Sequence, residues 1–258
     1  MIDSHCHIDF REFDKDREEV LREAQQAGVH TIINVGADVA TSGNAVELAR
    51  KHEMVYAAVG VHPHDAKSLD DAAFKEISRL ARQPRVVAIG EIGLDYYRDM
   101  SPRPIQKIAF HRQMQLAVEL KLPVVIHTRE AFDPTCLIVA EYAELIPGGV
   151  FHCFPGDVDE AYRVIEMGFV VGIGGVVTYD RSRMSRVAAE IPLENMILET
   201  DAPYLTPVPY RGKTNRPAYV RLVRDKIAEL RGIPAAEVER VTDLTCRKLF
   251  HLVETFGG

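Results

Sequence analysis

Short apolar runs alternate with longer amphipathic segments along the whole chain. Eight runs rich in valine and isoleucine end near His7, Gly36, His62, Glu91, His127, His152, Gly174 and Asp201. These runs are nearly continuous in apolar character, which is typical of parallel strands that are covered on both faces. The pattern therefore predicts eight buried parallel strands.

The segments between the runs carry apolar residues at helical spacing. Residues 17–28, 70–83 and 105–121 show this periodicity. The apolar stripe expected in the first segment consists of Val20, Leu21, Ala24 and Ala27. The stripe expected in the third consists of Ile108, Phe110, Met114, Leu116, Ala117 and Leu120. Two further helices are expected after Ala218.

Strands that alternate with helices favour an α/β fold, and eight such units favour a (β/α)8 TIM-type barrel. A doubly wound open sheet is the alternative, but it would not gather all eight strand ends around one pocket. The length of 258 residues suits one barrel, and no linker or low-complexity tract interrupts the sequence. We therefore expect a single domain over residues 1–258, with a long irregular loop at residues 206–217.

Composition and charge indicate in which compartment the protein works and which partners it can bind. The sum of 31 Lys and Arg against 38 Asp and Glu gives a net charge of −7, which argues against a globally basic nucleic-acid binder but not against a local basic patch. Four cysteines without a CxxC pair favour a reducing compartment. The sequence shows no signal-peptide pattern and no apolar run of membrane-spanning length, so we expect a cytoplasmic protein without a membrane partner or an obligate protein partner.

Unusual polar residues close several of the predicted strands. His5 and His7 lie two residues apart, so both imidazoles face the same side of a strand and can share one ion. Glu91 follows an apolar run, where a buried carboxylate needs a cation or a hydrogen-bonding partner. The alternatives are an arginine partner for Glu91 and ordinary hydrogen-bonded side chains for the two histidines.

Three further residues close the fifth, sixth and eighth strands. His127 and His152 end neighbouring strands, although either one alone would more often be a hydrogen-bonded core residue. Asp201 follows Glu199 by two residues, and two carboxylates at one strand end repel each other unless a cation or a shared proton relieves them. The alternative for Asp201 is a helix N-cap before Pro203.

Taken together, these residues exceed what one structural ion needs. Four histidines and two carboxylates at the carboxyl ends of barrel strands suit two adjacent metals about 3.5–4 Å apart, bridged by a carboxylate. The sequence therefore predicts a two-metal site formed by His5, His7, Glu91, His127, His152 and Asp201.

Several longer motifs run through the chain in this order: MIDSHCHID, GVHPHDA, AIGEIGLDYYRD, QKIAFHRQMQLA, LPVVIHTREA, FHCFPGD, LETDAPYLTP and PAYV. Through them the whole chain resembles the TatD family of metal-dependent deoxyribonucleases, within the amidohydrolase-like barrels.

The resemblance implies that His5, His7, Glu91 and Asp201 hold one metal and that Glu91, His127 and His152 hold the other. It also implies that His62 and Glu199 lie in the pocket, behind the ligands or facing phosphate. The implied activity is hydrolysis of DNA phosphodiesters, as a 3′-to-5′ exonuclease on single strands.

A mechanism follows as a hypothesis from two bridged cations. They lower the pKa of a shared water, so the expected nucleophile is a bridging hydroxide that attacks phosphorus in line. Glu91 and Asp201 are the expected catalytic residues, because Glu91 bridges the metals and Asp201 can orient or deprotonate the water. The ligand types suit Zn, Mn, Co, Ni or Mg to differing degrees.

An anionic substrate needs local positive charge. The basic residues expected near the strand ends are Arg98, Arg103, Lys107, Arg129, Arg211, Lys213 and Arg216. We expect Arg98 and Arg129 to bind substrate together with His62 and Glu199, and Tyr96 and Tyr97 to stack on bases. Ordinary solvated loop charge is the alternative for each basic residue.

The chain departs from the family pattern at Pro155 and at residues 214–217, where Arg216 replaces an acidic residue. These departures bear on substrate preference and do not touch a predicted metal ligand. The closest alternative function is another amidohydrolase-type enzyme acting on a small ester, amide or phosphoester. A zinc-dependent deaminase would need one metal only, so the two-metal set argues against it. A metal-binding protein without catalysis would use the same ligands but turn over no substrate.

Overall fold

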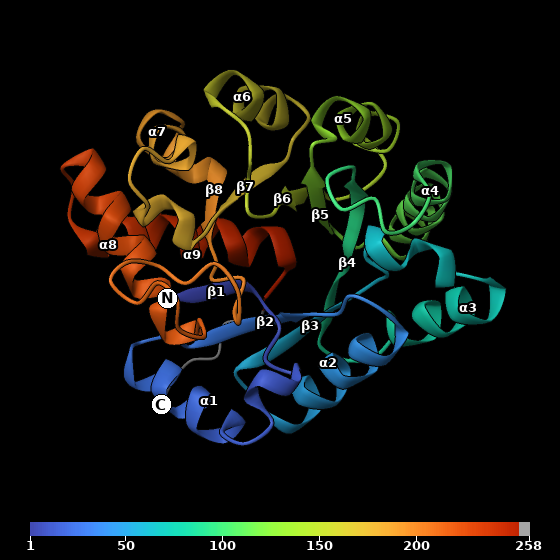
Figure 1. Ribbon diagram of the computed structural model, residues 1–258, viewed down its shortest axis with the longest axis horizontal. Helices are drawn as coiled ribbons and strands as arrows, with labels where there is room; N and C mark the ends of the chain where they lie inside the picture. Colours follow the sequence, from blue (N-terminus) through green and yellow to red (C-terminus); the bar gives the residue numbers. More distant parts are fainter. Residues whose placement is uncertain (253–258) are drawn as a thin grey trace.

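Parallel strands pair in the order of the sequence in the computed structural model, which describes residues 1–252 (Figure 1). The eight strands of this sheet are β1 (Ile2–Cys6), β2 (Thr31–Val35), β3 (Val55–Val59), β4 (Val86–Asp95), β5 (Val124–Arg129), β6 (Gly149–Phe151), β7 (Val170–Ile173) and β8 (Met196–Leu198). The segment after β8 returns to β1, since Cys6 bridges Ala202 and the Asp201 N–H donates to the His5 carbonyl at 2.8 Å. The predicted (β/α)8 barrel is confirmed.

Helices surround the strands (Figure 1). Those that follow β1 to β7 are α1 (Arg17–Gln26), α2 (Val39–Lys51), α3 (Asp71–Leu80), α4 (Arg103–Leu120), α5 (Phe132–Ala140), α6 (Val158–Glu166) and α7 (Arg183–Glu190). Two more, α8 (Val220–Arg231) and α9 (Ala235–Phe250), follow the loop after β8, as expected. The predicted domain end at residue 258 lies outside the described residues.

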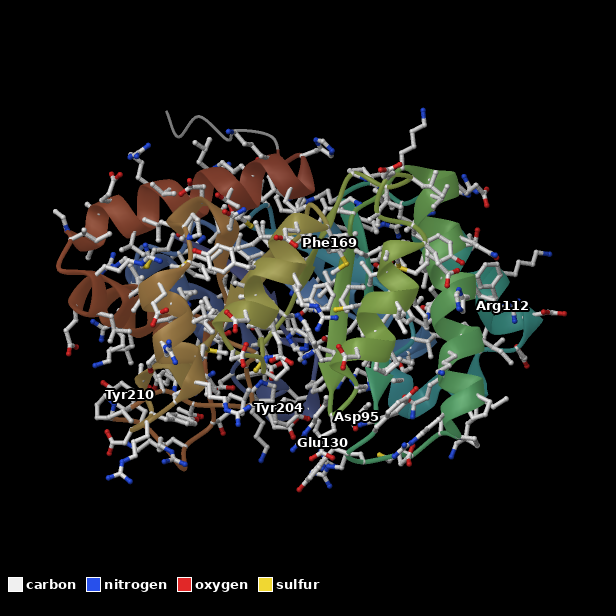
Figure 2. All side chains as sticks on the ribbon, turned by 90° about the horizontal axis from the view of Figure 1, so that it is seen from above. Asp95, Arg112, Glu130, Phe169, Tyr204 and Tyr210 are labelled. Atoms are coloured by element: carbon white, nitrogen blue, oxygen red, sulfur yellow. The ribbon has the colours of Figure 1, made fainter. Side chains whose placement is uncertain are left out.

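The apolar core has two parts because alternate residues of each strand point to opposite faces. The larger cluster fills the space between strands and helices. The smaller one joins strand residues such as Ile33, Ala58 and Ile197 to Cys246 and Phe250 of α9. Helix α9 therefore covers one end of the barrel, on the side of the molecule opposite Asp95, Glu130 and Tyr204 (Figure 2).

The predicted helix stripes hold in part. Val20, Leu21 and Ala24 of α1 are buried, as expected. In α4, however, Ile108 is 57% exposed, so its place in the stripe was wrongly predicted. The buried face of α4 instead includes Gln106 and Gln113, whose amides hydrogen-bond to the backbone of strands or loops near the strand ends.

Strand β4 is longer than predicted. It continues four residues past Glu91 to Asp95, and its register against β5 shifts between Ile89 and Ile92. Such a bulge re-aims the side chains beside it. The Glu91 side chain therefore projects from the middle of β4, and Asp95 is the last residue of the strand.

Within residues 1–252, none of the helices combines the length and the apolar character that crossing a bilayer requires.

Candidate metal centre

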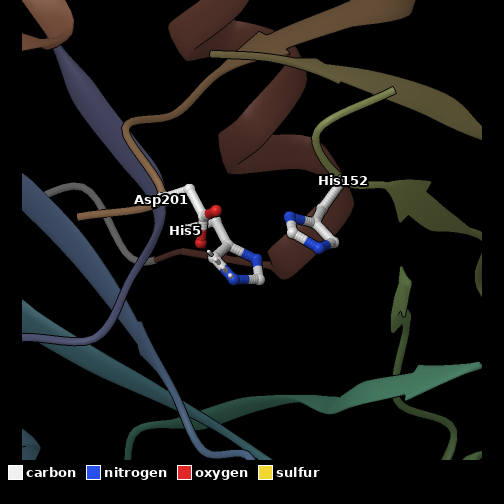
Figure 3. A group of neighbouring side chains, drawn as sticks. All are labelled: His5, His152 and Asp201. Atoms are coloured by element: carbon white, nitrogen blue, oxygen red, sulfur yellow. Dashed lines mark ion pairs between the residues drawn. The ribbon is translucent and has the colours of Figure 1, made fainter. Parts of the chain in front are cut away.

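The six residues predicted as metal ligands converge at the carboxyl ends of the strands. They come from β1 or the residue after it, from β4, from β5 and from the segments that follow β6 and β8. Figure 3 shows His5, His152 and Asp201 together. The His5 and His152 rings stack on each other, with their centroids 3.9 Å apart. All six side chains are at least four-fifths buried, and His127 is the most exposed at 16%.

Glu91 lies at the middle of this group, and its two carboxylate oxygens face different histidines. Oε2 lies 3.6 Å from Nε2 of His5 and 3.8 Å from Nε2 of His7. Oε1 lies 2.8 Å from both Nδ1 of His127 and Nε2 of His152. One carboxylate thus separates two histidine pairs, which is the arrangement that a bridging ligand requires.

Asp201 completes the first of these groups. Its Oδ1 lies 3.7 Å from Nε2 of His5 and 3.5 Å from Nε2 of His7. Ligand atoms about 2.1 Å from one tetrahedral Zn²⁺ lie about 3.4 Å from one another. The separations of 3.5–3.8 Å that join His5 and His7 to Glu91 Oε2 and Asp201 Oδ1 are close to this value, whereas the 2.8 Å contacts of Glu91 Oε1 have hydrogen-bond length. The donors are nitrogen and carboxylate oxygen, so these residues fit divalent cations.

In a site without metal, buried carboxylates such as Glu91 and Asp201 are expected to pair with arginine or lysine. Within residues 1–252, the ion pairs of Glu91 and Asp201 are made with histidines and with no arginine or lysine. The helix N-cap proposed for Asp201 is wrong, because in this described part of the chain the next helical element after it begins at Pro217. Two buried carboxylates surrounded by histidines, which are metal ligands when neutral, are the charge pattern that a cation neutralises.

Two histidines have a ring nitrogen fixed by a partner outside the group. Nδ1 of His7 donates to the Val35 carbonyl at 2.7 Å, and Nε2 of His127 donates to the Asp95 carboxylate at 3.1 Å. With one proton of each ring directed outside the group, the other nitrogen faces Glu91 or Asp201 and is the one that can release its proton and offer a lone pair to a cation. Metal-binding histidines in proteins are commonly oriented in this way.

His62 also approaches Glu91, with Nε2 3.4 Å from Oε1. Its Nδ1 accepts a hydrogen bond from the His64 N–H at 3.1 Å, so the ring proton of neutral His62 sits on Nε2. His62 therefore donates toward Glu91 and has no lone pair to offer there, which suits a place behind the ligands.

Charge in the group is set by burial and by the close contacts. Burial by itself raises the pKa of the Glu91 carboxyl, but the histidines around it, His152 foremost, bring that pKa well below its usual value of 4.5. Burial likewise opposes the ionisation of Asp201, yet the hydrogen bond with His7 lowers its pKa. Both carboxylates are therefore ionised at neutral pH.

The predicted substrate contacts divide into two kinds. Glu199 is fully buried, accepts a hydrogen bond from the Cys153 N–H and lies 3.8 Å from Nδ1 of His152, so it stands behind the ligands and away from solvent. Burial raises its pKa to about 7. Arg129 is exposed at the end of β5, with its guanidinium 3.9 Å from the centre of the Tyr97 ring, and Arg98 lies 6.0 Å from the same ring.

Arg216 does not join these basic residues. Its guanidinium pairs with Asp16 at 2.6 Å and with Glu23 at 2.7 Å, tying the loop after β8 to α1. Arg103 similarly pairs with Asp99. The expectation that both add free positive charge near the site was therefore wrong, since acidic side chains neutralise them.

Two residues near the site were not singled out from the sequence. Asp95 is buried at the end of β4, and its position four residues after Glu91 in the GLDYYRD segment was the available signal. Tyr204 is 50% exposed, and its ring centre lies 6.5 Å from that of His7. Its signal was an aromatic residue three positions after Asp201.

Comparison with known proteins adds an independent observation. Residues 2–251 match the family model described as TatD related DNase. The chain is 38% identical over 253 residues to the uncharacterized metal-dependent hydrolase YabD of Bacillus subtilis, covering 98% of this chain and 99% of that protein. It is 37% identical to the 3′-5′ ssDNA/RNA exonuclease TatD of Klebsiella pneumoniae, covering 97% of each. The crystal structure of the TatD homolog YjjV from Escherichia coli K12 superposes with a TM-score of 0.93 at 34% identity, covering 98% of each chain.

Proposed function

The chain belongs to the TatD family of metal-dependent hydrolases, and from this premise we propose that it removes nucleotides from the 3′ end of single-stranded DNA. The observation that carries the proposal is the position of Glu91, whose two oxygens face two separate pairs of histidines. A relative of comparable length named as a 3′-5′ ssDNA/RNA exonuclease supports the choice of substrate.

We assign two divalent cations to the centre. His5, His7, Glu91 and Asp201 would hold one, and Glu91, His127 and His152 would hold the other. Cations bound there supply positive charge to a phosphoryl group and acidify water. Four imidazoles favour Zn, Mn, Co or Ni over Mg, which prefers oxygen ligands and bound waters.

The residues of the chain have separate tasks in this proposal. Asp201 is 14% exposed, more than Glu91 at 5%, so its carboxylate can reach both the ligand group and a molecule in the mouth of the barrel. It is ionised at neutral pH, because the hydrogen bond with His7 and the charges of the neighbouring histidines together outweigh burial and lower its pKa. An ionised carboxylate in this position can accept a proton from an attacking water.

Aromatic and basic side chains form a rim along part of the mouth. We define this rim as Tyr97, Arg98, Arg129 and Tyr204. Tyr97 is 53% exposed and Arg129 stacks on its ring, while Tyr204 is 50% exposed beside His7. Exposed aromatic rings bind unpaired bases by stacking, worth about 1–3 kcal/mol per base, and arginine adds charge for the backbone. A single strand exposes its bases to such a rim, whereas a duplex does not.

Labelled oligonucleotides test the proposal. We expect chelator-treated protein to be inactive and Mn²⁺ to restore stepwise shortening of a 5′-labelled single strand from its 3′ end. A duplex of the same sequence should be shortened more slowly. Hydrolysis of small esters or amides with no turnover of any oligonucleotide would contradict the proposal and favour an amidohydrolase-type function.

A further inference from the structure

Asp95 joins two parts of the site without being one of the candidate ligands. It is fully buried. Its Oδ2 accepts from Nε2 of His127 at 3.1 Å and from Nε2 of His64 at 2.9 Å. Its Oδ1 accepts from the backbone N–H of Tyr97 at 3.0 Å and of Arg98 at 2.7 Å. One carboxylate thus contacts a candidate ligand on one side and the start of the rim on the other.

We infer that Asp95 is a positioning residue, which fixes the tautomer of His127 for the second cation and holds the loop that carries Tyr97. The inference rests on the proposed metal centre. Because Asp95 has no exposed surface, it cannot contact substrate, and its influence passes through the groups that donate to it.

The tautomer of His127 follows from the chemistry of a carboxylate. An ionised carboxylate only accepts hydrogen bonds, so Nε2 of His127 must carry the proton that points at Asp95. Nδ1, which lies 2.8 Å from Oε1 of Glu91, is then the nitrogen whose proton a cation would displace and whose lone pair it would take. Asp95 thereby determines which ring nitrogen of His127 can bind a cation.

Asparagine at position 95 would invert this choice. Two backbone N–H groups face Oδ1, so the amide oxygen must stay on that side. The amide NH₂ would then face His127 and His64, and each ring would have to accept with Nε2. The single proton of neutral His127 would then have to stay on Nδ1, where it blocks the lone pair that a cation needs.

The backbone of Asp95 is held independently of its side chain. Gln106 of α4 accepts from the Asp95 N–H at 2.8 Å and donates to the Asp95 carbonyl at 3.0 Å. Its amide also donates to the Ser101 carbonyl at 2.8 Å. Substitution of the carboxylate therefore leaves the end of β4 anchored, so the effect on His127 can be separated from a loss of fold.

Asp243 offers a matched control at the opposite end of the barrel. Its Oδ2 accepts from Nε2 of His30 at 2.9 Å, and its Oδ1 accepts from the Ile2 N–H at 2.9 Å. Like Asp95, it combines a histidine and a backbone donor on one carboxylate. It lies in α9, away from the candidate ligands.

Isothermal titration calorimetry, in which Mn²⁺ is added to the chelator-treated protein, tests the inference. We expect two sites in the parent and in Asp243→Asn. In Asp95→Asn we expect one site to weaken by roughly 10–100-fold, the typical cost of changing such a partner. With a single-stranded oligonucleotide, kcat should fall in Asp95→Asn while KM stays near that of the parent, because the amide oxygen still holds the loop. Asp95→Ala should change both.

The outcomes separate this inference from the proposed function. Fewer than two sites in the parent would contradict the two-metal centre itself. Parental affinity for both ions in a folded Asp95→Asn would overturn the role of Asp95 alone. Should Asp95→Asn fail to fold, ¹⁵N chemical shifts of His127 in the Zn²⁺-loaded parent decide the question. Protonated Nε2 with unprotonated Nδ1 supports the inference, and the reverse tautomer overturns it.

Discussion

At the scale of residues, contacts outside the candidate metal centre determine which ring nitrogen His7 and His127 direct into it. The Val35 carbonyl fixes His7, and the Asp95 carboxylate fixes His127. Val35 could not be chosen from the sequence, because it acts through its backbone. Asp95 was missed because it lies beyond the apolar run that marked β4. The six candidate ligands themselves could be predicted because each lies at the end of an apolar run in the sequence.

The first prediction concerns Asp201→Asn. The amide keeps the size of the side chain but removes the charge and the ability to take a proton from water. We expect a fall in kcat of roughly 10²–10⁴-fold, typical of losing a general base, with a smaller loss of metal affinity. Steady-state kinetics on a labelled oligonucleotide would show this, with Asp243→Asn as control. Turnover at the parental rate would leave Asp201 without an essential role.

Gly93 supports the second prediction. Its φ is +143°, and a Cβ at this position would lie 1.9 Å from the carbonyl oxygen of His127 on β5. Because that atom belongs to the backbone, Gly93→Ala must push β4 and β5 apart. We expect the free energy of unfolding to fall by about 2–5 kcal/mol, with weaker metal binding.

Gly43→Ala is the control for that substitution. Gly43 lies in α2, and a Cβ there meets no atom within 4 Å. Alanine in a helix is favoured over glycine by roughly 0.5–1 kcal/mol. Denaturant unfolding should therefore show a small gain for Gly43→Ala and a large loss for Gly93→Ala. Equal stability of the two variants would refute the role of the backbone contact at Gly93.

At the scale of elements, α4 illustrates what the sequence could and could not predict. Its helical periodicity was recognised, but its buried face includes Gln106 and Gln113, which an apolar stripe does not mark. Gln113 holds the N–H of Val61 at 2.7 Å, just before His62. These roles depend on β3 and β4 lying beside α4, a consequence of the closed barrel. The partners of Arg216, almost 200 positions away in the sequence, were hidden for the same reason.

Helix α9 gives the third prediction, through Asp243. Burial raises the pKa of this carboxyl, but the hydrogen bond with His30 and the nearby amino group of Met1 bring it below its usual value of 3.8. A carboxyl with a lower pKa in the folded state stabilises the fold above its unfolded pKa, and this contribution is lost as the pH falls through the folded pKa.

Asp243→Asn should therefore be less stable than the parent by roughly 1–2 kcal/mol at pH 7. The difference should shrink as the pH falls below about 4. Urea unfolding at pH 7 and at pH 3 would measure it. A difference that stayed constant across this range would show that the charge of Asp243 does not contribute.

At the scale of the whole molecule, stability and chemistry lie at opposite ends of the barrel. The candidate centre and the rim occupy the carboxyl ends of the strands, where catalytic residues lie in barrels of this type. The other end is covered by α9 (Figure 2). The net charge of −7 is therefore compatible with an anionic substrate, because the charge that matters is local to the rim.

This arrangement yields the fourth prediction, on salt dependence. Single-stranded DNA affinity should fall as salt rises, with a slope of about −0.7 per phosphate neutralised. Arg129→Gln should reduce the magnitude of that slope by about 0.7 if the residue contacts one phosphate. Arg240→Gln, on α9 at the opposite end, should leave it unchanged. Binding that ignores salt in the parent would contradict the role of the rim.

Anomalous scattering from crystals grown with Mn²⁺ or Zn²⁺ tests the two-metal centre most directly. We predict two peaks, one on each side of the Glu91 carboxylate. The first should contact His5, His7 and Asp201, and the second should contact His127 and His152. A single peak, or two peaks that do not share Glu91, would contradict the two-metal centre.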